Sequence, residues 1–396
     1  MAANQLSFNQ ISTLLNSVAN QATGTTNAAS TDTSSFVTQA QMVLATGYDN
    51  IIGAISQTLG KTIFDIRPYY RKFKGMLMDE QKWGYITREL IPIDKAFEDD
   101  ARMTLTDGYS VDQYTVNKPE VLQVNYYGQN LLEKSITIFK DQLDNAFTGP
   151  DQFGSFISMV MQNISDQFEQ AYEIQARMLL ANLITGRTLA TSPGTIVHLV
   201  TEYNTYIGSE SGSELTITDL RAPDKFPAFM KWVYARIATL TAMMTERTHL
   251  FHVNITNKAV VQHTPYDRQK VYLLAGERYG MEAQVLADTF HDNYLKFADV
   301  ETVNFWMSPN EPDKIIAKPS YLKYSDGEIA VADSAVTKTG VFGVIFDEMA
   351  LGHTLMNKWN AYTPFNAKGG YTNLFYHVTD RWHQNDCRNA IVLFLD

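Results

Sequence analysis

The sequence contains a single cysteine, Cys387, among 396 residues. One thiol cannot form a disulfide within the chain, and it gives no CxxC pair of the kind used at redox and zinc sites. Long apolar runs are also missing: the longest, such as 391–395, have about five residues, whereas a membrane-spanning helix needs about 20. The first residues, MAANQLSFNQ, lack the basic region and apolar core of a secretory signal. We therefore expect a soluble protein that is not inserted in a membrane.

Positive charge is scarce. The chain has 32 Lys and Arg residues against 43 Asp and Glu residues, a net charge of -11. DNA affinity comes largely from Lys and Arg that displace counterions from phosphates, so a protein that grips DNA is disfavoured, whereas an acidic wall that encloses DNA without binding it is compatible with this balance. With 45% hydrophobic residues, the chain can form one large domain or two to three smaller ones.

Recognisable catalytic motifs are missing as well. The sequence has no GxGxxG, GxxxxGK[ST], GxSxG or HExxH pattern. Ser320 to Lys323 and the KTG that begins at Lys338 match fragments of penicillin-recognising enzymes, but no S-D-N lies between them. We interpret both as chance matches and expect no catalytic residues and no cofactor.

Potential metal ligands gather near the C-terminus, where His377, His383 and Cys387 lie within a short stretch. A zinc site needs all of them within about 2.3 Å of one ion. On a strand the two histidines share a face but lie about 20 Å apart, and on a helix only His383 and Cys387 share a face. We therefore expect no metal site, and predict neighbouring strands at 374–378 and 390–395 with a polar connection.

The first 48 residues contain one charged side chain, Asp32. Their scattered apolar residues lie at rough helical spacing, which predicts a short amphipathic helix, while 22–35 has the composition of a flexible linker. A segment this polar cannot bury enough apolar area to offset its ordering entropy. We expect it either to stay loose or to become ordered against a neighbouring protein surface.

Residues 83–130 have an extended character. WGYITRELIPI and KPEVLQVNYYGQ both alternate and are rich in β-branched and aromatic residues. The acidic stretch between them has a turn signal at Asp107 and Gly108. We predict a long antiparallel hairpin whose arms, at about 3.3 Å per residue, reach beyond about 30 Å. Such an extension has too little material to pack on itself.

The strongest helix signal covers 151–185, where apolar residues recur every three or four positions. Pro150 suits its first turn and Gly186 its end. At 1.5 Å per residue this helix would be about 50 Å long, which indicates a strut.

A compact region follows. Its pattern predicts a helix over 224–247, a strand in LFHVNIT at 250–256, and a helix that begins at Thr264-Pro265 and ends at Gly280. His249 and His252, at the junction before the strand, are expected to be structural. Residues 300–356 predict mixed strands with a turn at Asp326-Gly327, and either a helix or a strand near 347–356.

This order of elements resembles the major capsid protein of tailed bacteriophages, the Hong Kong ninety-seven coat fold, and most closely its short-tailed podovirus branch. KPEVLQVNYYGQNLLEKSITIFKDQLDNAFTGPDQFGSFISMVMQNI looks like the return strand of that family's extended loop leading into its spine helix. FPAFMKWVYARIATL, LFHVNIT and TPYDRQKVYLLA look like the helix, strand and helix that open the axial domain. YTNLFYHVTDRWHQNDCRNAIVLF looks like the final strands.

The resemblance implies an α+β capsid fold with a defined series of parts. These are an N-terminal arm at 1–60, a connection at 61–82, the E-loop hairpin at 83–130, a peripheral domain at 131–223 with its spine helix at about 151–185, an axial domain at 224–368, and C-terminal strands at 369–396 that return to the peripheral domain.

It also implies a structural protein, not an enzyme, that self-assembles into an icosahedral or prolate bacteriophage head around double-stranded DNA. The implied partners are copies of the same chain, a separate scaffolding protein and a portal, with DNA held by enclosure and no membrane. Assembly would occur in the host cytoplasm and the product would be the virion capsid. The alternatives are an encapsulin-like cellular nanocompartment shell with the same fold, or an enzyme whose active site has no known motif.

The side chains expected at contacts between subunits come from the arm and the hairpin, the parts that cannot be stable by self-burial. They are Leu6, Ile11, Leu14, Leu15, Trp83, Tyr85, Asp107, Gly108, Tyr109, Tyr126 and Tyr127.

Removal of residues 1–47 should leave a folded subunit that assembles poorly, because this segment contributes little burial of its own. Circular dichroism would report folding, and electron microscopy with gel exclusion would report shell yield. A truncated chain that assembles as well as the full chain would contradict the prediction.

Overall fold

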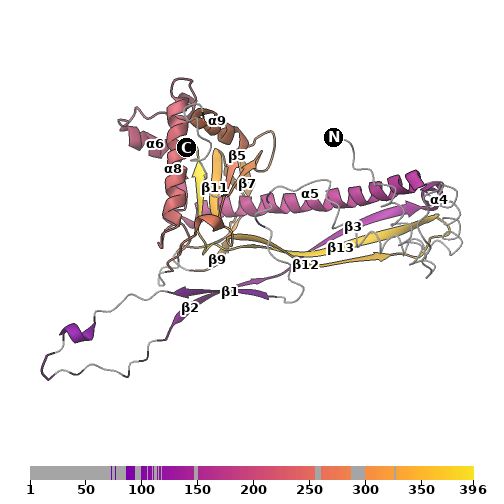
Figure 1. Cartoon of the computed structure of the whole chain (residues 1–396), viewed down its shortest axis with the longest axis horizontal. Coiled ribbons are helices and arrows are strands. Elements are labelled where there is room, and N and C mark those ends of the chain that lie inside the picture. The colour runs from indigo at the N-terminus through magenta and orange to yellow at the C-terminus, as the bar shows by residue number, and fades with distance from the viewer. Residues whose placement is uncertain are drawn as a thin grey trace.

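The computed structural model describes residues 73, 76, 86–93, 100–104, 106–108, 110, 114, 116, 118–146, 150–254, 260–286, 299–324 and 327–396. They form an elongated part, a compact part and a projecting hairpin (Figure 1).

The elongated part is a three-stranded antiparallel sheet with a long helix along it (Figure 1). The strand order is β12 (Leu351–Tyr362), β13 (Tyr371–Gln384) and β3 (Asn130–Phe139). Helix α4 (Lys140–Ala146) follows β3, and α5 (Pro150–Ala190) then runs back along the sheet. Burial alternates along β3 and along most of β13, as expected when one face of a sheet is covered and the other is open.

Helix α5 confirms the predicted strut and is longer than predicted, with 41 residues. The prediction that Gly186 ends the helix is wrong, because the helix continues through it to Ala190. A Cβ at Gly186 would lie 3.1 Å from the Cβ of Tyr321 in β8 (Ser320–Leu322). This glycine therefore allows a strand to pack closely against the helix.

The compact part is built on a five-stranded sheet. Its order is β4 (Ile196–His198), β14 (Ala390–Phe394), β11 (Val341–Asp347), β5 (Gln269–Leu274) and β6 (Asp299–Val303). Every residue of β11 and β14 is buried, which explains why both strands read as continuous apolar runs.

Both faces of this sheet are covered. Helices α6 (Leu199–Ile207), α7 (Ile217–Leu220), α8 (Phe226–Met244) and α9 (Ala275–Leu286) contribute to one core cluster with β5, β11 and β14. A second cluster joins the C-terminal half of α5 to the other side chains of the same strands. The predicted helix over 224–247 is confirmed as α8.

The predicted pairing of the last two strands is wrong. Strand β13 lies between β12 and β3, whereas β14 lies between β4 and β11 in the other sheet. The burial patterns give the physical reason: most of β13 alternates and suits a sheet with one open face, while the wholly apolar β14 suits the centre of a covered sheet.

The helix predicted to begin at Thr264-Pro265 is also wrong. Instead of a helix over 264–280, the chain forms the short 3-10 helix η3 (Tyr266–Arg268), then β5, then α9, with Gly280 inside α9. The segment QKVYLL is rich in strand-forming residues and pairs on both sides, with β11 and β6.

Residues 251–254 do not form the predicted strand. Phe251 has a φ of 70°, and the backbone bonds instead to the 386–390 loop, with the N–H of Val253 donating to the carbonyl of Asp386. The rest of that predicted strand lies outside the described residues.

The hairpin consists of β1 (Ile86–Ile93) and β2 (Glu120–Tyr127), which pair antiparallel with Ile86 opposite Tyr127. Beyond it lies the 3-10 helix η2 (Ala101–Thr104). The turn predicted at Asp107 and Gly108 is present, and Gly108 has a φ of 90°, a conformation that favours glycine. Smaller sheets pair β7 (Ile315–Ala317) with β10 (Val336–Lys338) and β8 with β9 (Ile329–Val331). Asp326 of the other predicted turn lies outside the described residues.

Candidate subunit interfaces

One carboxylate anchors the root of the hairpin to the body. Glu89 on β1 accepts hydrogen bonds at one oxygen from Asn385 Nδ2 at 2.6 Å and from Tyr126 OH at 3.0 Å. Its other oxygen accepts from Arg388 Nε at 2.7 Å and also from Nη2 of the same guanidinium. Charge-assisted bonds of this kind are roughly twice as strong as neutral ones. The anchor therefore fixes β1 to the loop between β13 and β14.

Apolar packing supports the same contact. Ile91 is only 4% exposed and forms a cluster with Val260 and Cys387, and four partly buried side chains pack against it: Ile93, Leu122, Val124 and Leu322. Because strand residues alternate between faces, Glu89, Ile91 and Ile93 form one inward face of β1. The side chains between them point to the open face.

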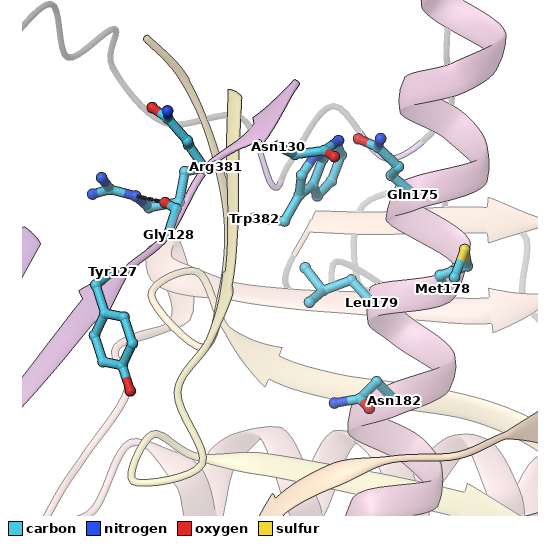
Figure 2. Close-up of a pocket in the computed structure, with 10 residues that line it drawn as sticks. Tyr127, Gly128, Asn130, Gln175, Met178, Leu179, Asn182, Arg381 and Trp382 are labelled. Atoms are coloured by element: carbon cyan, nitrogen blue, oxygen red, sulfur yellow. Dashed lines mark hydrogen bonds between the residues drawn. The ribbon is translucent and has the colours of Figure 1, made fainter. Parts of the chain in front are cut away.

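A short joint connects the hairpin to the elongated sheet. Gly128 lies between β2 and β3 with a φ of 94°, and its carbonyl accepts a hydrogen bond from Arg381 Nε at 3.0 Å. Arg381 is 3% exposed. A buried guanidinium on β13 thus holds the backbone at the point where the hairpin leaves the sheet (Figure 2).

Beside this joint lies a groove of about 570 Å³ between the start of β3 and helix α5 (Figure 2). Residues 127–130 form one wall, Gln175, Met178, Leu179 and Asn182 on α5 form the other, and Arg381 and Trp382 lie between them. Gln175 Oε1 is buried and has no hydrogen-bond partner among the described residues. The groove is therefore lined by apolar side chains together with several amides.

The distal part of the hairpin exposes large apolar side chains. Met103 is 85% exposed, Tyr114 81% and Val116 76%. On the open face of the root, Leu90, Val121 and Tyr127 are each more than half exposed. This surface extends away from the body (Figure 1), and such exposed patches mark interaction sites.

A second apolar surface lies on the three-stranded sheet. Leu131, Phe139 and Trp359 are each about half exposed or more. Trp359 stacks on His377 with ring centroids 3.8 Å apart, and His377 Nδ1 lies 3.8 Å from Glu133 Oε2 on the next strand. These residues define an aromatic surface, which we call the open sheet face.

Only some of the contact residues predicted from the sequence lie on exposed surfaces of the described part of the chain. Asp107 and Gly108 are exposed near the distal end of the hairpin and Tyr127 is exposed at its root, but Tyr126 points inward to Glu89. Leu6, Ile11, Leu14, Leu15, Trp83, Tyr85 and Tyr109 lie outside the described residues.

The most informative residues of the root were not predicted. Glu89, Arg381 and Arg388 carry the polar contacts, and the only sequence signal was that Glu89 alternates in phase with Ile91 and Ile93 in ITRELIPI.

The candidate metal ligands are separated. His377 lies on the open sheet face, His383 packs against the ring of Tyr126 at 4.6 Å, and Cys387 is buried in the following loop. Burial raises the pKa of the Cys387 thiol to about 12. Among the described residues, no group of three or more His, Cys, Asp or Glu side chains is placed to hold a metal ion.

His252 has the structural role expected of it. Its side chain is completely buried, Nε2 lies 2.9 Å from the Val260 carbonyl, and Nδ1 lies 3.0 Å from the Leu250 carbonyl. Burial lowers the pKa of His252.

None of the helices in the described ranges is both long enough and apolar enough to cross a membrane.

Comparison with known proteins gives one family. The model of the Phi29-like phage major capsid protein family matches residues 11–394. A chain in the capsid structure of Staphylococcus phage Andhra is similar at 10% identity and a TM-score of 0.55, over 84% of this chain and 86% of that chain. A chain in a structure described as the head fiber and inner core protein gp22 of native bacteriophage P68 gives 10% identity and a TM-score of 0.52 over the same shares. No curated protein sequence matches.

At this identity the structures establish the fold, a mixed helix and sheet fold of the Hong Kong ninety-seven type.

Substitution of Glu89 by Ala should loosen the hairpin root, because the poorly exposed Arg388 loses its carboxylate and keeps only a long hydrogen bond to Gln262. We expect the free energy that protects the β1 and β2 amides from hydrogen exchange to fall by about 2–3 kcal/mol. Glu133→Ala is the control, since its carboxylate is 55% exposed and should change protection by about 0.5 kcal/mol or less. Equal effects of the two substitutions would contradict this assignment.

A fall in pH should destabilise the folded chain through His383. Burial lowers the pKa of His383 to about 4, an effect that Glu89 opposes and that Arg381 and His353 reinforce, while an unfolded histidine titrates near 6.5. The unfolded state therefore takes up the proton first, and the stability present above about pH 6.5 is lost as pH falls toward 4.

The comparison is with His383→Gln, measured by urea denaturation. Between about pH 7 and pH 5, the parent chain should lose about 1–2 kcal/mol more than the variant. Parallel loss in both chains would rule out His383 as the titrating group.

Proposed function

The chain belongs to the Phi29-like phage major capsid protein family, and on this premise we propose that its projecting hairpin holds the shell together by packing on neighbouring copies of the chain. The role of the family is structural, and this chain is a subunit of a bacteriophage capsid shell. The matched family and structures are phage capsids, so the encapsulin-like alternative has no support among them.

The observation that carries the proposal is the exposure of Met103, Tyr114 and Val116 at 76–85%. An isolated subunit leaves these side chains in water, whereas burial of a large apolar side chain contributes about 1.5–3 kcal/mol. A neighbouring subunit supplies that burial. In a shell the gain is repeated at every hairpin.

We propose the open sheet face as the surface that receives the hairpin. Figure 1 shows the hairpin beyond the sheet, on the side away from α5. A neighbouring subunit with the same orientation in the layer therefore presents its sheet, and not its helix α5, to this hairpin. Leu131, Phe139 and Trp359 give that face an apolar and aromatic character, which suits the Met, Tyr and Val side chains of the hairpin.

The division into domains follows the two sheets in this proposal. The elongated part, with α5 as its spine helix, serves as the peripheral domain, and the compact part serves as the axial domain that meets its copies around fivefold and sixfold axes. Strand β14 belongs with the axial domain here, because it pairs with β4 and β11. The arm at 1–60 would lie across neighbouring subunits.

We also propose a separate scaffolding protein and a portal as partners, assembly in the host cytoplasm, and no enzymatic activity. DNA would be held by enclosure rather than by specific contacts. A net charge of -11 supports this, because Lys and Arg supply most DNA affinity and an acidic wall lets packed DNA move freely.

Replacement of residues 94–116 by a short turn should impair shell formation far more than it lowers the thermal stability of the subunit. A second variant keeps the length and changes only side chains: Met103→Ser, Tyr114→Ser and Val116→Ser together. Both should give few shells by electron microscopy while circular dichroism retains the parent helicity. Large loss of helicity in either variant, or full shell yield from the triple variant, would contradict the proposal.

A further inference from the structure

The open face of the hairpin root carries a single charge. Its exposed side chains, among the described residues of β1 and β2, are Arg88, Leu90, Pro92, Val121, Gln123, Asn125 and Tyr127. Arg88 is the only Lys, Arg, Asp or Glu in this set, and its side chain forms no hydrogen bond or ion pair with any described residue. The subunit therefore leaves one cation unpaired among neutral side chains.

The open sheet face carries a single exposed charge of the opposite sign. Glu133 is the only carboxylate that the described residues of β3, β12 and β13 present on this face. It is 55% exposed, and His377 Nδ1 lies 3.8 Å from its Oε2, which is beyond hydrogen-bond distance. Arg381 has the same phase on β13 but is buried and bonded to the Gly128 carbonyl. The Glu133 carboxylate can therefore accept hydrogen bonds from outside the subunit.

We propose that Arg88 of one copy pairs with Glu133 of a neighbouring copy, with the open face of the hairpin root laid on the neighbour's open sheet face. This inference rests on the proposed function and names the polar contact that positions the hairpin. A guanidinium and a carboxylate can form two parallel charge-assisted hydrogen bonds. Each copy offers one hairpin and one sheet, and such a head-to-tail contact generates rings.

The surroundings of the two charges match. Leu90 lies two residues from Arg88 on the same face of β1. Trp359 and His377 lie in one row with Glu133 across the sheet. Apolar and aromatic side chains can pack on one another in several positions, but one cation and one anion meet in a single register. The ion pair therefore fixes where the hairpin lies, while the apolar contacts supply most of the buried area.

The ends of the sheet decide the direction of the hairpin. Strand β3 begins at Asn130, close to Glu133, and the hairpin of that subunit leaves the sheet at Gly128. In the other direction β3 continues for six residues to Phe139, a length of about 20 Å. The distal part of the docked hairpin therefore runs toward Phe139, whose ring lies 6.0 Å from that of Tyr371.

Other occupants fit less well. DNA would find one cation on the hairpin face and an anion on the sheet face, and its affinity comes from several Lys and Arg residues. A different protein would need surfaces complementary to both faces, whereas a second copy already carries them. Copies with a net charge of -11 repel each other, so a contact that joins opposite charges is favoured.

Charge reversal in the full-length chain tests the pair. Arg88→Glu leaves two carboxylates in the contact, and Glu133→Arg leaves two guanidinium groups. Each single variant should reduce shell yield by about tenfold or more, while circular dichroism retains the parent helicity. The chain with both substitutions reverses the pair and should regain most of the parent yield. Electron microscopy with gel exclusion measures the yield.

A mixture of the two single variants tests whether the pair forms between copies. Each hairpin in the mixture finds a sheet of opposite charge on a copy of the other kind, so shells should form again and contain both chains. The matched control is Lys318→Glu, because Lys318 is exposed and its side chain has no described partner. It changes the net charge as much as Arg88→Glu does and should assemble like the parent.

Several results would overturn the pair: parent yield from either single variant, low yield from both the double variant and the mixture, or an equal loss with Lys318→Glu. Recovery in the double variant but not in the mixture would place the pair within one subunit and would also overturn it. Recovery of the single variants only with a separate scaffolding protein in excess would assign these side chains to that partner, against the proposal.

Failure of the proposed function is a separate result, read from the chain in which a short turn replaces residues 94–116. Full shell yield from that chain would overturn the proposed function and the pair together. Low yield from that chain, with parent yield from both charge reversals, would overturn the pair alone.

Discussion

The C-terminal turns of α5 fix the elongated part of the subunit to the compact part. Leu180, Leu183 and Ile184 pack in one cluster with buried side chains of β11 and β14, while the same helix runs along the three-stranded sheet (Figure 1). Because β11 and β14 are central strands of a covered sheet, they cannot shift without opening the core. This cluster therefore helps to hold the elongated part and the compact part in one relative orientation.

A line of polar contacts extends this control to the hairpin. Arg187, near the end of α5, is completely buried, and its Nη2 donates to the carbonyl of Arg388 at 3.0 Å. The side chain of Arg388 in turn holds Glu89 of β1. Burial lowers the pKa of Arg187, and Asp386 opposes that effect. Helix, loop and hairpin are thus connected through charged groups that are largely removed from water, where each broken bond is costly.

Local patterns were sufficient for the parts of the fold that local physics decides. The period of apolar residues predicts α5 and α8, and alternation with a glycine turn predicts the hairpin. Local patterns do not predict which distant segments pair. The sequence of β14 indicates a strand, but only its pairing with β4 and β11 places it in the compact sheet. Pro265 and Gly280 at its two ends predict a helix for the segment that contains 269–274, but hydrogen bonding to a strand on each side makes these residues β5.

The candidate interfaces show the same limit. Exposure of Tyr127 and burial of Tyr126 follow from alternation once the register is known, but the sequence does not say which phase faces inward. Glu89 reads as one more surface acid until Arg388, almost 300 residues later, is placed beside it. The groove at Gly128 has no signal in any one segment, because its walls come from β3, α5 and β13.

The hairpin is fixed to the body only at its root, among the residues that the structure describes, and projects from there. The anchor at Glu89 and the guanidinium at Gly128 lie at the root of the hairpin, close to the body, while the 3-10 helix η2 lies at the far end of the extension (Figure 1). A small tilt at the root therefore becomes a larger displacement at the distal end. With the hairpin packed on a neighbour as proposed, small movements around these two side chains would change the angle between subunits without any change in the core.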